Sequence, residues 1–228
     1  MKKLTYLLIP SILLALFVIW TALVKVVDVQ YVGAAGFLGF YSLNSQINDF
    51  IQGLNTKPFD LITDLLMYFA LSTIVPFAVV GIVQLAKRKD LKKVDSTLYV
   101  ILAGYVAVVV MYFVFEIVKI NYSPLSTEEE LKASYPSSHV MVYSVVLGMA
   151  VLGLLHFVKM HDDVKLLINI FYMFSTFGVA ALRLFSGQHY FTDIIGGLLI
   201  SYTILFAINS LYRYLRNEKT EIEKENND

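Results

Sequence analysis

Between two long apolar runs, the chain carries the short polar segment RLFSGQHYFTD at residues 183–193. The runs lie at about residues 164–185 and 191–212, and each is long enough for a helix to cross the roughly 30 Å hydrocarbon core of a bilayer. Helices joined by so short a connection are antiparallel neighbours. The segment therefore predicts a helical hairpin in a membrane, with its polar turn at one border.

The composition extends this prediction to the whole chain. Of 228 residues, 57% are hydrophobic and 16% charged, and the mean hydropathy is +0.67, which is too apolar for an ordinary soluble domain. Runs of membrane-spanning length lie at about 4–27, 61–86, 97–120, 139–158, 164–185 and 191–212. We expect an all-α polytopic protein, a six-helix bundle that forms a single membrane domain over residues 1–216. The charged tail 217–228 is expected to be a disordered or fraying cytoplasmic extension.

The first run resembles a signal peptide, because Lys2 and Lys3 precede it and small residues follow it. It is longer than a cleavable apolar region, which favours a retained first helix. The chain has no cysteine, so disulfides, iron–sulfur clusters and thiolate zinc sites are excluded.

The distribution of basic residues predicts the orientation. Thirteen of the eighteen Lys and Arg lie at 2–3, 87–93, 159–165 and 213–224. By the positive-inside tendency, both termini and these connections are cytoplasmic and the protein lies in the cytoplasmic membrane. The connections expected on the outer face are 28–60, 121–138 and 186–190. The first of these is predicted to contain a short helix on the membrane surface, or a lid, and Pro76 is expected to kink the second span.

The polar turn contains candidate catalytic residues. His189 and Asp193 are four residues apart, so on a helix they share one face and lie within hydrogen-bonding reach. An imidazole held in this way has a fixed tautomer and a more nucleophilic free nitrogen. Arg183, six residues earlier, has a fork of donors suited to phosphate oxygens. Alone, Arg183 reads equally well as an arginine that reaches to the interface, and His189 as a border histidine.

A second polar segment, YPSSH at residues 135–139, stands just before the fourth span. Ser137 and Ser138 would lie at the positive end of that helix, where backbone N–H groups bind anions. Either serine as a simple N-cap is the alternative, and it is compatible with anion binding. His139 is placed to act as a general acid, or it marks the membrane border.

These segments resemble the motifs of the type 2 phosphatidic acid phosphatase, or lipid phosphate phosphatase, superfamily. The family motifs are Lys-x6-Arg-Pro, Pro-Ser-Gly-His and Ser-Arg-x5-His-x3-Asp. The third appears here as Arg183-x5-His189-x3-Asp193, with Leu182 in place of its leading serine. The second appears at residues 136–139, with Ser138 in place of glycine. The six-span topology also matches over residues 61–212.

The first motif departs from the family pattern. When Pro124 is aligned with the family proline, Ser123 stands where arginine is usual and Glu116 where lysine is usual. Lys119 lies one helical turn away and is a candidate to reach the same pocket, or it only extends to the interface from the third span.

The resemblance implies roles for these residues. His189 would attack phosphorus and form a phosphohistidine, with Asp193 orienting the ring. His139 would protonate the leaving group and then assist water. The phosphate oxygens would be held by Arg183, Lys119, Ser137 and Ser138.

No cofactor or metal is expected, since Asp193 is the only acidic residue that the sequence places near both motifs. His156 and His161 fall on the opposite face. The expected partners are a lipid phosphate substrate and membrane lipids, with no nucleic acid. The leading interpretation is a membrane phosphatase acting on undecaprenyl diphosphate, phosphatidylglycerol phosphate or phosphatidic acid at the outer interface. A lipid phosphotransferase and a weakened protein that binds or transports a lipid phosphate are the alternatives.

Overall fold

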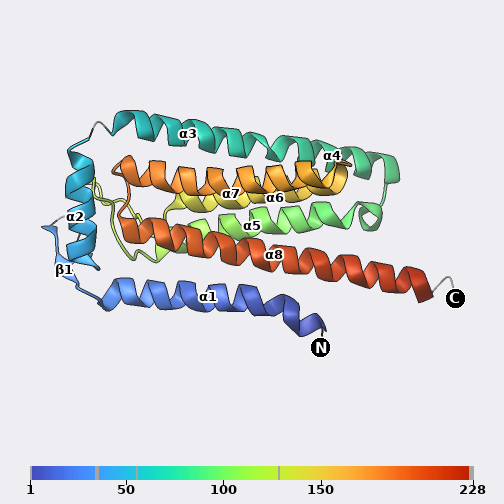
Figure 1. Cartoon of the computed structure of the whole chain (residues 1–228), viewed down its shortest axis with the longest axis horizontal. Helices are drawn as coiled ribbons and strands as arrows, with labels where there is room; N and C mark the ends of the chain where they lie inside the picture. The colour runs from blue at the N-terminus through green and yellow to red at the C-terminus, as the bar shows by residue number, and fades with distance from the viewer. Residues whose placement is uncertain (1, 34–35, 55, 128, 226–228) are drawn as a thin grey trace.

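The computed structural model describes residues 2–33, 36–54, 56–127 and 129–225, and Figure 1 shows a bundle of long helices with a short helix across one end. The helices among these residues are α1 (Lys2–Val26), α2 (Tyr41–Gln52), α3 (Lys57–Ser72), α4 (Ile74–Arg88), α5 (Ser96–Ile117), α6 (Ser138–Phe157), α7 (Asp162–Phe185) and α8 (Phe191–Glu225). A 3-10 turn follows α4 at Leu91–Lys93, and an antiparallel hairpin pairs β1 (Gln30–Tyr31) with β2 (Phe37–Leu38).

Six helical stretches are long and apolar enough to cross a membrane. The helices α1, α5, α6, α7 and α8 supply one each, and α3 with α4 supplies another over Lys57–Arg88. The predicted six-span all-α bundle is thus confirmed, and the chain is a multi-pass membrane protein. The irregularity expected near Pro76 lies at Thr73, where α3 ends and α4 begins. Proline lacks the N–H that would bond the carbonyl four residues earlier, which weakens the helix at this point.

The two polar segments lie at the same end of the bundle. In Figure 1 the connection between α7 and α8 lies beside α2, and both chain ends lie at the far end together with the connection between α4 and α5. We call the end with residues 135–139 and 183–193 the site end, and the other the terminal end. This arrangement agrees with the prediction, made from the positions of Lys and Arg, that successive connections lie alternately on the two faces of the membrane. Which end faces outward stays a prediction.

Helix α6 is the central helix of the bundle. It packs against α3, α5, α7 and α8, and 61% of its most apolar window is buried, against 17% for the windows of α1 and α7. The N-terminus of α6 is therefore held by neighbours on several sides. This matters because residues 135–139 form that N-terminus.

The segment between the first two spans contains the helix predicted for it. Helix α2 lies across the site end (Figure 1), and its buried Asn44 donates from Nδ2 to Thr192 Oγ1 at 3.0 Å. The Asn44 Oδ1 accepts from the Thr192 backbone N–H at 3.3 Å. Helix α2 is thereby tied to the first turn of α8, next to the polar turn.

The charged tail differs from the prediction. We expect it to be disordered or frayed from Asn217, but α8 continues to Glu225. The sequence between these positions is rich in Glu and Lys, which favour helix. Residues 226–228 lie outside the described residues.

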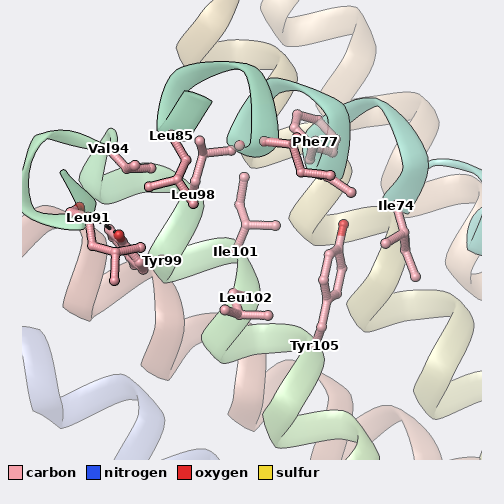
Figure 2. A pocket seen from close by; sticks show the side chains of 13 residues that line it. Ile74, Phe77, Leu85, Leu91, Val94, Leu98, Tyr99, Ile101, Leu102 and Tyr105 are labelled. Carbon is pink, nitrogen blue, oxygen red and sulfur yellow. Dashed lines mark hydrogen bonds between the residues drawn. The ribbon is translucent and has the colours of Figure 1, made fainter. Parts of the chain in front are cut away.

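An apolar cavity of about 330 Å³ lies between α4 and α5 (Figure 2). Its lining includes Phe77, Leu98 and Ile101, and the buried Tyr105 hydroxyl beside it has no hydrogen-bond partner among the described residues. No histidine and no arginine lines it. The lining is therefore suited to apolar groups and not to polar chemistry.

Close packing against α8 fixes the position of residues 135–137, which precede α6. A Cβ atom added at Gly196 would stand 2.5 Å from Tyr135 Cε2, and one at Gly197 would stand 3.0 Å from the Ser137 carbonyl oxygen. Tyr135 is itself 1% exposed, and its hydroxyl lies 2.6 Å from Thr21 Oγ1 of α1. Residues 135–137 are thus clamped between α1 and α8.

Gly196→Ala is predicted to destabilise the protein by about 1–3 kcal/mol, because the new methyl group overlaps the Tyr135 ring. Gly178→Ala in α7 is the matched control, since a Cβ there meets nothing within 4 Å. The measurement is the unfolding midpoint of both variants in detergent. Equal midpoints for the two variants would contradict the packing described here.

Candidate active site

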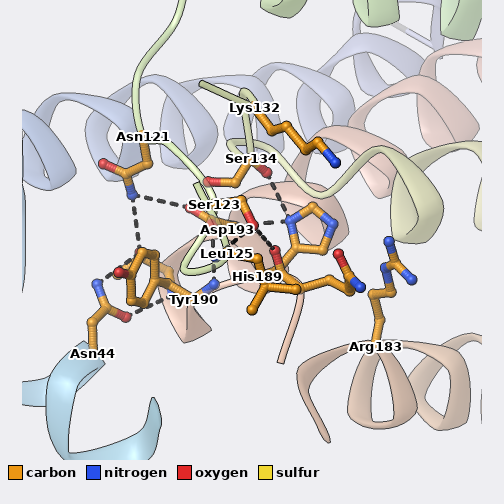
Figure 3. Close-up of polar contacts among 12 residues, drawn as sticks. Asn44, Asn121, Ser123, Leu125, Lys132, Ser134, Arg183, His189, Tyr190 and Asp193 are labelled. Atoms are coloured by element: carbon orange, nitrogen blue, oxygen red, sulfur yellow. Dashed lines mark hydrogen bonds and ion pairs between the residues drawn. The ribbon is translucent and has the colours of Figure 1, made fainter. Parts of the chain in front are cut away.

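His189 lies in the connection between α7 and α8 and is 8% exposed. Its Nδ1 is 3.0 Å from the Ser134 carbonyl oxygen (Figure 3). A carbonyl only accepts, so Nδ1 carries the hydrogen and Nε2 keeps its lone pair. The Nε2 atom has no hydrogen-bond partner among the described residues. It is a free nucleophilic nitrogen on a ring whose orientation is fixed.

The direct hydrogen bond expected between His189 and Asp193 is not formed. Asp193 Oδ2 lies 4.0 Å from His189 Nδ1 and accepts instead from the Tyr190 N–H at 3.0 Å. Helix α8 begins at Phe191, so Asp193 is its third residue and its carboxylate reaches back to the residue before the helix. Asp193 Oδ1 accepts from Asn121 Nδ2 at 3.0 Å. The Asp193 carboxylate thus lies beside the His189 ring, while the Ser134 carbonyl orients the ring.

The surroundings keep His189 neutral. Burial lowers the pKa of His189 to about 3, and the nearby positive charges of Arg183 and His139 act in the same direction. A neutral imidazole is the nucleophilic form. The same interactions place Arg183 and His139 close to the ring, as the motif spacing predicts.

Two carboxylates that the sequence analysis missed also lie here. Asp60 Oδ1 accepts from Arg183 Nη1 at 2.6 Å, and Asp64 Oδ1 is 3.1 Å from His139 Nε2. The expectation that Asp193 is the only acidic residue near both motifs is therefore wrong, because the packing of α3 on α6 and α7 brings a distant segment to the site. The available signal was a pair of carboxylates one helical turn apart at the start of an apolar span, where charges are costly and usually have a function.

Several buried polar atoms lie at or near the N-terminus of α6. The first N–H groups of a helix have no partner within the helix. Ser137 is the N-cap residue and is fully buried, but its hydroxyl makes no cap hydrogen bond. Among the described residues, three buried side-chain atoms near this terminus have no hydrogen-bond partner: Ser137 Oγ, His139 Nδ1 and Arg183 Nε. Buried polar atoms are nearly always paired in folded proteins, so these three atoms are suited to bind a polar ligand.

The first motif is organised differently from the expectation. Ser123 Oγ donates to the Gln188 carbonyl oxygen at 2.9 Å, which ties the connection before α6 to the residue preceding His189. Lys119 is exposed, and its ammonium lies over the Tyr122 ring, 5.7 Å from the centroid. Helix α5 ends at Ile117, so Lys119 is no longer on the helical face from which we expect it to reach the pocket. The structure does not bring Lys119 into contact with the two histidines or Arg183.

Lys132 is the basic residue closest in sequence to Ser134, whose carbonyl oxygen orients the His189 ring. Its carbonyl accepts from the Ser123 N–H at 2.8 Å, so it lies opposite the position where the family arginine is expected. Residues two apart on an extended segment share a face, which places the Lys132 side chain on the same side as Ser134. Figure 3 shows that Lys132 and Ser134 belong to the same connection before α6. Its ammonium pairs with Glu130 at 3.2 Å and is largely exposed.

The other two histidines lie outside the site, as predicted. His156 Nε2 is 3.2 Å from Asp95 Oδ2, at the start of α5 on the terminal end. His161 is exposed and pairs with Asp163 at 3.1 Å. Among the described residues, no group of three or more His, Asp and Glu side chains is placed to hold a metal ion, so metal dependence is a question for the assay.

Comparison with known proteins gives a family and a fold. The family model of the PAP2 superfamily matches residues 98–217. The structure is similar to the crystal structure of a transmembrane PAP2-type phosphatidylglycerolphosphate phosphatase from Bacillus subtilis, with a TM-score of 0.60 and 19% identity. That match covers 90% of this chain and 96% of the other. No curated protein matches the sequence.

The neutral state of His189 predicts a dependence of stability on pH. An unfolded histidine binds its proton near pH 6.5, whereas the folded ring binds it only near pH 3. Between these values the unfolded chain holds one more proton, so the free energy of unfolding falls as the pH is lowered, by up to about 1.4 kcal/mol per pH unit. His189→Asn, which keeps a donor for Ser134, is expected to flatten this dependence between pH 6 and 4. The measurement is the unfolding midpoint against pH, with His161→Asn as the control; identical slopes in wild type and His189→Asn would contradict it.

Proposed function

The chain belongs to the PAP2 superfamily, and from this we propose that it is an integral-membrane phosphatase that hydrolyses lipid phosphates through a phosphohistidine on His189. The proposal includes an outward-facing site in the cytoplasmic membrane, with both termini on the cytoplasmic side. The distribution of Lys and Arg supports that orientation.

One observation carries the proposal. Among the described residues, the buried atoms Ser137 Oγ, His139 Nδ1 and Arg183 Nε have no hydrogen-bond partner, and they belong to side chains at the N-terminus of α6 and close to His189. Their hydrogens, with the N–H groups of Ser138 and His139 in the first turn of α6, suit the several oxygens of a phosphate. A tetrahedral anion bound there would give these atoms hydrogen-bond partners.

In the first half-reaction, His189 Nε2 attacks phosphorus and the bond from phosphorus to the leaving oxygen breaks. The proton for that oxygen comes from His139, so the lipid leaves as a neutral alcohol or a protonated phosphate. Arg183, Ser137 and the Ser138 N–H hold the equatorial oxygens and stabilise the developing charge. Asp193 and the Ser134 carbonyl keep the His189 ring in place while it gains positive charge.

In the second half-reaction, water attacks phosphorus and the bond to His189 Nε2 breaks. His139, now neutral, takes a proton from the water, and inorganic phosphate leaves. His189 returns to its neutral form and His139 to its protonated form. The cycle consumes one water and needs no electron donor or acceptor.

The substrate class follows from the position of the site. The N-terminus of α6 lies at the border of an apolar span, where a lipid can keep its chains in the bilayer while its headgroup enters the pocket. Phosphatidylglycerol phosphate is the first substrate to test, because the similar fold belongs to a phosphatase named for it. Undecaprenyl diphosphate and phosphatidic acid complete the panel.

Purified protein in detergent is expected to release inorganic phosphate from at least one of these three lipids, in the presence of EDTA. His189→Ala removes the nucleophile. The rate of phosphate release is expected to fall by about 1,000-fold or more, which is the size of effect seen for catalytic nucleophiles. His161→Ala is the matched control and should retain full activity.

Each other result has a defined meaning. Full activity in His189→Ala would exclude the phosphohistidine. Transfer of labelled phosphate to an acceptor rather than to water would indicate a phosphotransferase. Binding of a phosphorylated lipid without turnover would indicate a binding protein, in keeping with Ser123 and Glu116 in the first motif.

A second prediction concerns the cation that serves this site. Lys132→Ala is expected to raise KM for the lipid phosphate by about fivefold to tenfold. Its side chain leaves the extended segment on the same side as that of Ser134, and a charge-assisted hydrogen bond to the substrate would contribute on the order of 1.5 kcal/mol. Lys119→Ala should change KM less than twofold, since that ammonium lies over the Tyr122 ring. Steady-state kinetics of the two variants decide the matter, and the reverse order would restore the role first expected for Lys119.

A further inference from the structure

Two carboxylates on one face of α3 hold two functional side chains. Asp60 and Asp64 are four residues apart, so both project from the same side of the helix. Asp60 binds Arg183, and Asp64 binds His139, from helices that lie far away in the sequence. The two carboxylates are partly exposed, with side-chain exposures of 37% for Asp60 and 45% for Asp64.

Each carboxylate binds one nitrogen of its partner side chain, and a second nitrogen of that side chain has no hydrogen-bond partner among the described residues. Asp60 binds Nη1 of Arg183, while Nε of that guanidinium is buried without a partner. Asp64 binds Nε2 of His139, while Nδ1 of that ring is buried without a partner. We propose that Asp60 and Asp64 are positioning residues, which fix Arg183 and His139 so that Arg183 Nε and His139 Nδ1 are presented to the substrate phosphate. This inference rests on the proposed phosphatase function and adds two residues to its machinery.

The guanidinium of Arg183 is held by more than one contact. Its Nη1 also lies 3.4 Å from Thr63 Oγ1, one residue before Asp64 on α3. The second oxygen of Asp60 accepts from Gln188 Nε2 at 3.4 Å, next to His189. Asp60 therefore links the guanidinium to the polar turn. A planar guanidinium held along one edge presents its other edge in a defined direction, which suits recognition of a phosphate.

The contact with Asp64 selects the state of the His139 ring. A carboxylate accepts a hydrogen, so Nε2 carries one, and Nδ1 is the atom that exchanges a proton with the substrate. The charged groups that face His139 are Asp60 and Asp64 from α3, Arg183 from α7 and His189 from the turn after α7. In the proposed mechanism, His139 must hold a proton before the leaving group departs, so a carboxylate such as that of Asp64 is needed beside the ring.

The same contacts have a competing interpretation. Carboxylates on Arg183 and His139 could occupy the places of phosphate oxygens and would then have to leave before substrate binds. The two interpretations predict opposite effects. Removing a positioning carboxylate weakens phosphate binding or proton transfer, whereas removing a competitor strengthens binding.

The first experiment tests Asp64. For Asp64→Asn, kcat/KM is expected to fall ten- to a hundredfold, and the alkaline limb of its pH profile should move to lower pH, because the protonated ring loses its counter-ion. Asp49→Asn, an exposed carboxylate of α2 at the same end, is the matched control and should match wild type. An unchanged profile in Asp64→Asn would overturn the role of Asp64.

A measurement without turnover accompanies it. In protein labelled with ¹⁵N-histidine, the His139 resonances are expected to report hydrogen on Nε2 in wild type and a mixture of both tautomers in Asp64→Ala. The same tautomer in both proteins would overturn the proposal. If wild type releases no phosphate from any lipid, the proposed function fails, but this spectrum still decides whether Asp64 orients the ring.

The second experiment tests Asp60. Binding of inorganic phosphate, read from the rise in unfolding midpoint with phosphate concentration, is expected to weaken about tenfold in Asp60→Asn. Asp60→Glu keeps the charge and is expected to lose less affinity, which keeps the test valid if Asp60→Asn does not fold. Phosphate binding that is equal to or tighter than in wild type in both variants would overturn the positioning role and favour competition.

Discussion

The site end of the molecule depends on one buried carboxylate. Asp193 is 0% exposed, and a charge in such a position must be paired or hydrogen-bonded. Its side chain accepts from Asn121 and from the Tyr190 N–H, and its backbone carbonyl accepts from the Ser137 N–H at 3.0 Å. One residue therefore joins the connection before α6, the start of α6 and the start of α8. The N-terminus of α6 and the His189 ring lie where these three segments meet.

This arrangement explains why the ring can be oriented without a direct bond from Asp193. The carboxylate fixes the segments, and one of them carries Ser134, whose carbonyl oxygen binds the ring at 3.0 Å. Ser123 adds a second tie, from the same connection to the Gln188 carbonyl oxygen. The serine that replaces the family arginine thus has a structural partner in this chain. The loss of that positive charge is accompanied by a second cation, Lys132, on the same connection.

The sequence predicted what short spacing determines. The six spans, the helix starts near residues 138 and 191, and the closeness of Arg183, His139 and His189 follow from apolar runs and from motifs at helix ends. Asp60, Asp64 and Ser134 were not predicted, because their contacts with Arg183, His139 and His189 join residues 123, 75 and 55 positions apart. Such contacts depend on which helices pack together, and apolar runs do not specify that. The position of Lys119 was not predicted either, because it depends on α5 ending at Ile117.

The packing of α1 along α8 has a consequence for biogenesis. Trp20 Nε1 donates to the Thr192 carbonyl oxygen at 3.1 Å, and Ser210 Oγ donates to the Tyr6 carbonyl oxygen at 2.6 Å. Helix α1 is synthesised before α3 to α7, and its principal partner α8 is synthesised after them. Until α8 is inserted, α1 lacks that partner and is surrounded by lipid, which its apolar sequence tolerates. Assembly of the site end, where α1 also supports Tyr135, therefore waits for the synthesis of α8.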